Sequence, residues 1–172
     1  LSERNPLILS SLISYAANEA LRLEDGCPEF TDRLRSIASD PSRTHEIRLT
    51  AFRQYYKSAR TEEQREELYS IWKAQQAYPA LELSERDFTD LACQLMVAFP
   101  DRAREIATVQ SERITNPDRQ DTFEMLCLAA SPDPDVRNTL FASFLESAQN
   151  RRPESRVLAA LSLLCHRLRH EE

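Results

Sequence analysis

The sequence predicts an all-α protein, and three observations support this fold class. First, the 172 residues include a single glycine, Gly26, whereas hairpin turns, strand bulges and phosphate-binding loops commonly need glycine for its positive φ. Second, charged residues make up 29% and hydrophobic residues 41% of the chain, and strong helix formers predominate among them. Third, prolines recur at positions typical of helix starts. We expect no sheet, which excludes Walker-type and dinucleotide-binding folds.

Capping signals place the start of each helix. The pairs Asn5-Pro6, Asp40-Pro41, Asn116-Pro117 and Asp133-Pro134 each put a capping side chain before a proline at the first helical position. Thr61 with Gln64 and Ser84 with Asp87 resemble capping boxes. Together with starts at Pro28, Pro100 and Pro153, these signals predict nine helices, approximately at residues 6–24, 28–38, 41–59, 62–77, 85–98, 100–114, 117–130, 134–148 and 153–169.

Helical spacing of apolar residues predicts a buried face on three of these helices. The three stripes are Phe88, Leu91, Ala92, Leu95, Met96 and Phe99, then Val136, Leu140, Phe141, Phe144 and Leu145, then Val157, Ala160, Leu161, Leu164, Cys165 and Leu168. The last helix also carries Leu158 and Leu163 outside its stripe, so we expect it to be covered on more than one side.

The helix starts from Pro100 onward recur every 17 to 19 residues, at positions 100, 117, 134 and 153. Short connections make successive helices antiparallel, so each helix pair spans about 34 to 38 residues, near the period of helical-hairpin repeats. The predicted architecture is an αα-superhelix of about eight or nine antiparallel helices, similar to HEAT and armadillo arrays. A compact up-and-down bundle is the competing arrangement. Residues 1–172 are expected to form one helical domain.

The formal net charge of −6 disfavours a nucleic-acid partner. The charge is uneven, because residues 150–170 contain five arginines and one acidic residue. Tyr55, Tyr69 and Trp72 lie near basic residues and could stack on bases, but core packing is the favoured interpretation. No apolar run approaches the ~20 residues that cross a bilayer, so no membrane segment is expected.

The sequence offers few residues for catalysis. His45-Glu46 begins like a zinc-protease helix, but Leu49 occupies the position of the second histidine. Cys165 and His166 are adjacent on a helix and point about 100° apart, so they cannot share a proton. The four cysteines form no C-x-x-C pair and are expected to be unpaired and structural. Carboxylate pairs such as Glu66-Glu67 are expected on solvated surfaces. We therefore expect no catalytic, cofactor or metal site in this chain.

Residues 110–169 nevertheless resemble a known family. The distinctive parts are the element Asn116-Pro117-Asp118-Arg119 and the ending from Leu161 to Arg169, which reads Leu-x-x-Leu-x-His-x-Leu-Arg with an additional apolar residue, Leu163. These are similar to the C-terminal helical domain of bacterial zinc aminopeptidases, the gluzincin family of aminopeptidase N. The chain departs from the family at Arg156, where an aromatic residue is common, and at Arg167, where proline is common.

The resemblance implies a multidomain enzyme whose catalytic domain holds zinc through a His-Glu-x-x-His helix and grips the substrate amine with a Gly-x-Met-Glu-Asn strand. Neither motif occurs here. The chain would then be the non-catalytic C-terminal piece, closing over the catalytic cavity and limiting peptide access, in the bacterial cytoplasm or periplasm. Its partners would be the catalytic domain of the same polypeptide and the C-terminal part of a peptide substrate. The candidate motif and cavity-facing residues are Asn116, Asp118, Arg119, Arg151, Arg152 and Arg169.

Arginines facing such a cavity would attract a peptide carboxylate through charge-assisted hydrogen bonds. Pairing within the domain is the alternative for the same arginines. Two other functions remain open from the sequence, namely a free-standing helical-repeat scaffold that binds proteins, and a peptidase in its own right.

Overall fold

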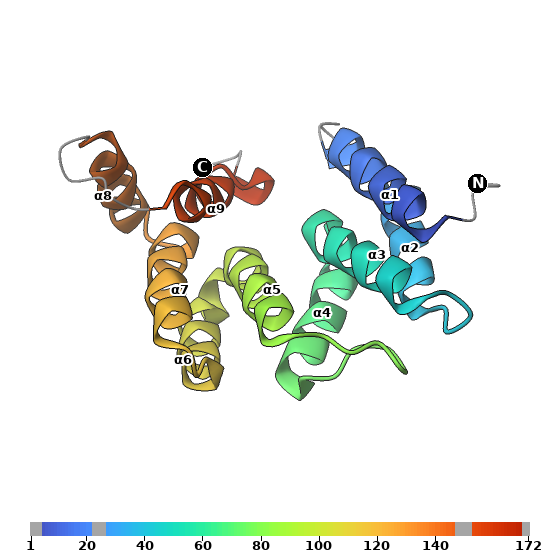
Figure 1. Cartoon of the computed structure of the whole chain (residues 1–172). Helices are drawn as coiled ribbons and strands as arrows, with labels where there is room; N and C mark the ends of the chain where they lie inside the picture. The colour runs from blue at the N-terminus through green and yellow to red at the C-terminus, as the bar shows by residue number, and fades with distance from the viewer. Residues whose placement is uncertain (1–4, 22–26, 147–152, 170–172) are drawn as a thin grey trace. The chain divides into compact units, whose positions relative to one another are not determined.

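The computed structural model describes residues 5–21, 27–146 and 153–169. Within these ranges all regular structure is helical, which confirms the predicted all-α class (Figure 1). The elements are α1 (Pro6–Leu21), α2 (Pro28–Ser39), α3 (His45–Ser58), α4 (Glu62–Ala74), α5 (Glu85–Ala98), the 3-10 turn η1 (Pro100–Arg102), α6 (Ala103–Arg113), α7 (Pro117–Ala130), α8 (Pro134–Leu145), α9 (Glu154–Leu164) and the 3-10 turn η2 (Arg167–Arg169). The chain divides into two compact units, residues 1–87 and 88–172.

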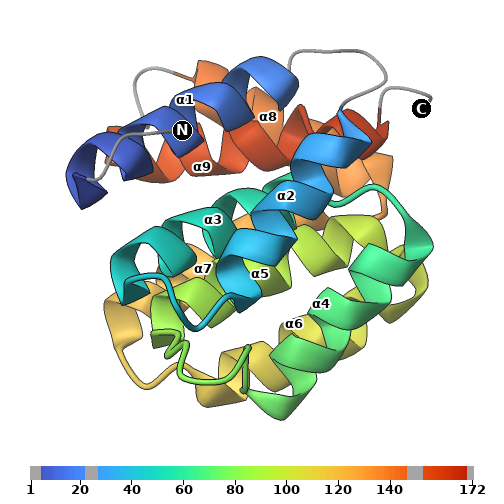
Figure 2. The ribbon, with the colours of Figure 1, turned by 90° about the vertical axis from the view of Figure 1, so that its right-hand side faces the viewer.

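In the N-terminal unit, α3 packs against both α1 and α2, as Figures 1 and 2 show. The centre of this unit is aromatic. Phe52 and Tyr55 of α3 and Trp72 of α4 are almost completely buried, and the Phe52 ring meets those of Tyr56 and Tyr78 edge to face. The prediction that Tyr55, Tyr69 and Trp72 pack in a core is therefore confirmed.

Most predicted caps are present. Thr61 Oγ1 accepts from Gln64 N at 3.2 Å, and Gln64 Oε1 accepts from Thr61 N at 3.3 Å, which completes the predicted capping box of α4. Ser84 and Asp87 make the same reciprocal pair at the start of α5, at 2.9 and 3.3 Å. Asn116 and Asp133 accept from backbone amides in the first turns of α7 and α8. Local sequence thus determines where these helices begin.

The predicted helix start at Asp40-Pro41 is wrong. The Asp40 carboxylate accepts from the Ser42 amide at 2.9 Å and from the Ser42 hydroxyl at 2.6 Å, which closes a turn in place of capping a helix. The backbone becomes helical only at His45, after Thr44 in an extended conformation. An aspartate followed by proline can form either structure, and here the serine two residues later favours the turn.

The segment between α4 and α5 contains two positive-φ residues that are not glycine. Gln75 (φ 53°) ends α4 in the left-handed conformation, and Ala80 (φ 56°) turns the chain back toward α5. The Gln75 amide donates to the Trp72 carbonyl at 3.3 Å, and its side chain donates to the same carbonyl at 2.6 Å. Left-handed positions thus occur in this chain without glycine, at a conformational cost of about 1 kcal/mol each.

In the C-terminal unit, α7 contacts α6, α8 and α9. Buried side chains come from several helices, among them Leu91, Leu95, Ile106, Phe123 and Ala160. Gln110 of α6 is also buried, and its amide donates to Thr89 Oγ1 at 3.0 Å. The predicted buried stripe of residues 88–99 is confirmed from Phe88 to Met96, while Phe99 is half-buried.

The other two predicted stripes are only partly buried. In α8, Leu140 is buried, but Phe141 and Leu145 are 46% and 70% exposed. In α9, Ala160 and Leu163 are buried, whereas Leu158 is 58% exposed and Cys165 is exposed. Both helices pack on α7 and on each other, and within the described part of the unit these contacts cover less than the full width of each apolar stripe. The prediction that α9 is covered on more than one side is therefore wrong at Leu158.

Candidate functional site

The element Asn116 to Arg119 lies at the N-terminal end of α7, and the ending Leu161 to Arg169 runs through α9 and η2, where its last residue contacts the C-terminal end of α7. At the N-terminal end, Asn116 Oδ1 accepts from the Arg119 amide at 3.2 Å, so Asn116 is the helix cap. The side chains of Asp118 and Arg119 are exposed in the first turn. The Asp118 carbonyl accepts from Arg156 Nη2 at 3.3 Å, which connects α9 to the start of α7. The element Asn116 to Arg119 thus begins α7 and connects it to α9.

At the C-terminal end of α7, Arg169 supplies donors to the free carbonyls. Its Nη1 donates to Ala129 at 2.9 Å and to Leu163 at 3.3 Å, and its Nη2 donates to Ala130 at 2.8 Å and to Ser131 at 3.1 Å. A cation at this end also complements the helix dipole. Arg169 therefore makes the within-domain contacts that the sequence left open as an alternative to a substrate role.

His166 supports the 3-10 turn that carries Arg169. Its Nδ1 accepts from the Leu168 amide at 3.2 Å, and its Nε2 lies 2.9 Å from Gln94 Oε1. A nitrogen that accepts from an amide carries no proton, so the neutral ring has its proton on Nε2 and donates to the Gln94 oxygen. Both ring nitrogens are engaged, as expected of a structural histidine adjacent to the exposed Cys165.

The four predicted site residues that the structure describes do not converge on one point. Asn116 and Arg169 act at opposite ends of a helix of 14 residues, which is roughly 20 Å long. Asp118 and Arg119 share the N-terminal end with Asn116. Arg151 and Arg152 lie outside the described residues. The arginine-rich segment of residues 150–170 thus includes at least one arginine, Arg169, that caps a helix of the same unit.

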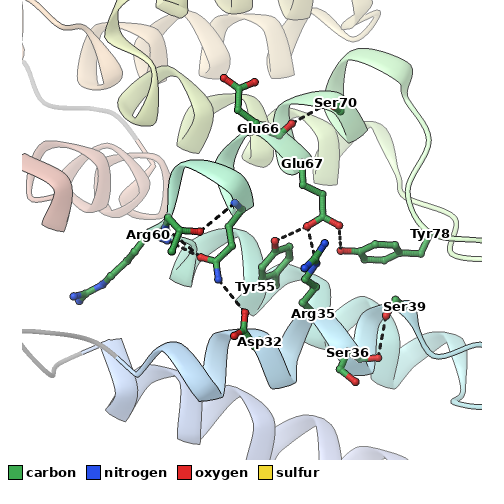
Figure 3. Close-up of polar contacts among 12 residues, drawn as sticks. Asp32, Arg35, Ser36, Ser39, Tyr55, Arg60, Glu66, Glu67, Ser70 and Tyr78 are labelled. Atoms are coloured by element: carbon green, nitrogen blue, oxygen red, sulfur yellow. Dashed lines mark hydrogen bonds and ion pairs between the residues drawn. The ribbon is translucent and has the colours of Figure 1, made fainter.

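The N-terminal unit contains a polar cluster that the sequence did not indicate. Figure 3 shows Arg35 of α2, Tyr55 of α3 and Tyr78 of the following segment converging on Glu67 of α4. Glu67 Oε2 accepts from Tyr55 Oη at 2.7 Å and from Arg35 Nε at 2.8 Å, and Oε1 accepts from Tyr78 Oη at 3.0 Å. The prediction that this carboxylate lies on a solvated surface is wrong, because its side chain is only 21% exposed.

The two tyrosines of the Glu67 cluster are held in their neutral form. Burial raises the pKa of Tyr55, and the hydrogen bond to the nearby Glu67 carboxylate raises it further. Burial and the Glu67 charge act in the same direction on the pKa of Tyr78. Groups that ionise only at high pH cannot serve as bases at neutral pH. The cluster therefore fastens three helices and a connecting segment together.

Arg48 of α3 has a similar structural role. It is 2% exposed, and its guanidinium donates to the carbonyls of Ala38 at 2.9 Å, Pro79 at 2.8 Å and Ala80 at 3.3 Å. These contacts join the end of α2 to the segment after α4. The sequence contains a signal for this burial, because Arg48 lies four and seven residues before Phe52 and Tyr55 on the same helical face.

Two of the cysteine thiols, those of Cys93 and Cys127, are poorly suited to nucleophilic chemistry. All four cysteines, each within the described ranges, are unpaired as predicted. Burial raises the pKa of Cys93 well above its ordinary value and, with the charge of Glu124, raises that of Cys127 to about 12. His45 is the first residue of α3, and its Nε2 lies 3.1 Å from the Glu82 carbonyl oxygen. Thiols that stay protonated are poor nucleophiles.

Among the described residues, no group of three or more histidine, cysteine or acidic side chains is arranged to hold a metal ion. No helix in the described ranges combines the length and the apolar character needed to cross a bilayer. Searches with family models, among curated proteins and among solved structures find no match for this chain.

Proposed function

We propose that this chain is a non-catalytic helical domain that acts by covering part of a neighbouring protein. The observation that carries the proposal is the apolar surface of the C-terminal unit. Leu128 of α7, Phe141 and Leu145 of α8 and Leu158 of α9 are all large hydrophobic side chains that are substantially exposed. Phe141 and Leu145 are one helical turn apart on α8, and the three helices that carry the four side chains pack against one another. Exposed apolar groups that cluster on a protein mark sites of protein contact.

The neighbour that we propose is the catalytic domain of a zinc aminopeptidase in the same polypeptide. This part rests on the resemblance of residues 110–169. Asn116 and Arg169, which belong to the resembling segment, both stabilise α7 as caps. Helix α7 packs against α8 and α9, so these two residues support the helices that carry the exposed apolar side chains. The domain would close over the catalytic cavity and limit which peptides enter, while zinc and the catalytic residues would belong to the neighbour.

The coding sequence upstream in the parent reading frame tests this proposal. We expect it to encode a His-Glu-x-x-His helix followed by a distant glutamate. A frame that lacks this motif would leave a free-standing interaction scaffold as the function, because the exposed apolar surface serves that role equally well. Zinc-dependent peptide turnover by the isolated chain would contradict both functions.

Arg119, Arg151 and Arg152 remain candidates for contact with the substrate carboxylate. Alanine substitutions of these arginines in the full-length enzyme should raise KM for peptides more than KM for small amino-acyl amides, because only peptides extend to the covering domain. Equal effects on both substrates would show that these arginines act within the fold. Arg169 is excluded from this comparison, because its removal would uncap α7.

A further inference from the structure

Helix α1 has a second apolar face in addition to the one that packs on α3. Leu9, Ile13 and Ala17 are buried, and α1 packs on α3 (Figure 1). Four other large apolar side chains are exposed, from 39% for Leu12 and 46% for Ile8 to 67% for Tyr15 and 68% for Leu7. A surface helix in a folded protein normally places polar residues opposite its buried face. The exposed face of α1 therefore requires an explanation.

Three of these side chains form a single seam along the helix. Ile8, Leu12 and Tyr15 are separated by four and three residues, which is the spacing that packs one helix along another. With about 100° per residue, the seam lies more than a third of a turn around the helix from the buried face. Ser11, at the edge of the seam, is exposed and uncharged. The seam thus fits one partner helix.

The charge pattern indicates which partner can approach. From Pro6 to Asn18, α1 carries no charged residue, while the whole chain has a formal charge of −6. Two negatively charged copies of the chain would repel each other in most orientations. Along this uncharged segment they can meet without placing like charges face to face. A lipid surface is a poorer match, because helices that lie on membranes carry lysine or arginine on their polar face, and α1 has neither.

The seam is also nearly symmetric about Leu12. If two α1 helices lie antiparallel, Leu12 meets its counterpart near a twofold axis, and the larger Tyr15 of each copy faces the smaller Ile8 of the other. Such an interface is isologous, since the same residues contribute from both sides. We propose that a second copy of this chain docks on α1, with the two α1 helices antiparallel.

The exposed area predicts a weak dimer. The three seam side chains offer roughly 300 Å² per copy, less than half of the ~800 Å² that each partner buries in a stable complex. Association should therefore be reversible and visible only at high protein concentration. This inference is independent of the proposed function, which rests on the C-terminal unit.

Sedimentation equilibrium of the whole chain tests the proposal. The weight-average mass should rise with concentration toward twice the monomer mass. Ile8→Glu and Tyr15→Lys should each abolish this rise, while Ala74→Glu, at an exposed site at the end of α4, should leave it unchanged. Far-UV circular dichroism of each variant should match the parent chain, because all three side chains are exposed.

Mixing the two α1 variants tests the antiparallel orientation. In an antiparallel pair, Glu at position 8 of one copy faces Lys at position 15 of the other, so an equimolar mixture should regain the rise in mass. In a parallel pair these charges do not meet. A chain that stays monomeric at all concentrations, or a dimer that is insensitive to Ile8→Glu and Tyr15→Lys, would overturn the proposal. Loss of dimer in both variants without recovery in the mixture would overturn the antiparallel arrangement.

Discussion

At the scale of single residues, this chain replaces glycine with other residues at left-handed positions. Ala80 has φ 56° in the segment that Arg48 anchors to α2 and α3. A Cβ atom at this φ crowds the following carbonyl oxygen, whereas glycine avoids the crowding. The cost of this conformation is local, so it can be measured by a single substitution.

Ala80→Gly should stabilise the protein by about 0.5–1 kcal/mol, which corresponds to a rise of roughly 2–4 °C in Tm. The Ala80 carbonyl that accepts from Arg48 is unchanged by the substitution. Ala77→Gly is the matched control, because Ala77 lies in the same segment at negative φ and should lose a little stability through backbone entropy. Equal effects of the two substitutions in thermal denaturation would show that Ala80 is not strained.

The buried tyrosines of the Glu67 cluster predict a loss of stability at alkaline pH. Folding raises the pKa of Tyr55 and Tyr78 above that of an unfolded tyrosine, which is about 10. Their contribution to stability is therefore complete below about pH 10 and is lost as the pH rises toward the folded-state pKa values. In that window each tyrosine should lower the free energy of unfolding by about 1.4 kcal/mol per pH unit.

Denaturant unfolding between pH 9 and 11.5 measures this slope. Tyr55→Phe should lower stability at neutral pH, because it removes the hydrogen bond to Glu67, and should also make the alkaline slope shallower by about 1.4 kcal/mol per pH unit. Tyr15→Phe, at an exposed position, serves as the control. An unchanged slope in Tyr55→Phe would indicate that this hydroxyl ionises equally in the folded and unfolded states.

At the scale of helices, α7 is stabilised from both ends by residues that the resemblance singled out. Asn116 caps the first turn, and Arg169 donates to the carbonyls of Ala129 and Ala130 in the last turn and of Ser131 just after it. The helix therefore depends on a contact that is nearly 40 residues away in sequence. The C-terminal segment is fixed to the core by the same contact.

Arg169→Ala should cost about 2–3 kcal/mol in the free energy of unfolding, because it removes several hydrogen bonds from a charged donor. Arg169→Lys should recover less than half of this loss, since an ammonium group cannot match the two parallel donors of a guanidinium. Arg119→Ala, at the exposed N-terminal end of the same helix, should stay within about 0.5 kcal/mol of the parent. A loss at Arg169 no larger than that at Arg119 would show that the capping contact does not stabilise the fold.

Local sequence signals predicted the helices well and the polar contacts between helices poorly. Capping boxes at Thr61 and Ser84 act over three residues, so the sequence contains both partners of each contact. Glu67, by contrast, meets Tyr55, Arg35 and Tyr78 only after three helices have packed. No short spacing encodes such a cluster. The exposed faces of α1 and α8 were missed for a related reason, since an apolar stripe does not specify how much of it the neighbouring helices cover.

At the scale of the whole molecule, the two units share one property. Each has buried apolar side chains that come from several helices, and each leaves other apolar side chains exposed, on α1 in the N-terminal unit and on α7 to α9 in the C-terminal unit. A protein built in this way is suited to binding other proteins. We propose a catalytic neighbour as the partner of the C-terminal surface and a second copy of the chain as the partner of the α1 surface.

The kinetics of the proposed parent enzyme with Leu145→Asp test the central claim most directly. If the C-terminal apolar surface holds this domain over the catalytic cavity, kcat/KM for long peptides should change several-fold, while kcat/KM for a small amino-acyl amide should stay within about twofold, since a charge at the surface leaves the chemistry intact. Leu12→Asp on α1 should change neither value. Identical kinetics of Leu145→Asp and the parent enzyme on both substrates would contradict the claim that this domain controls peptide access.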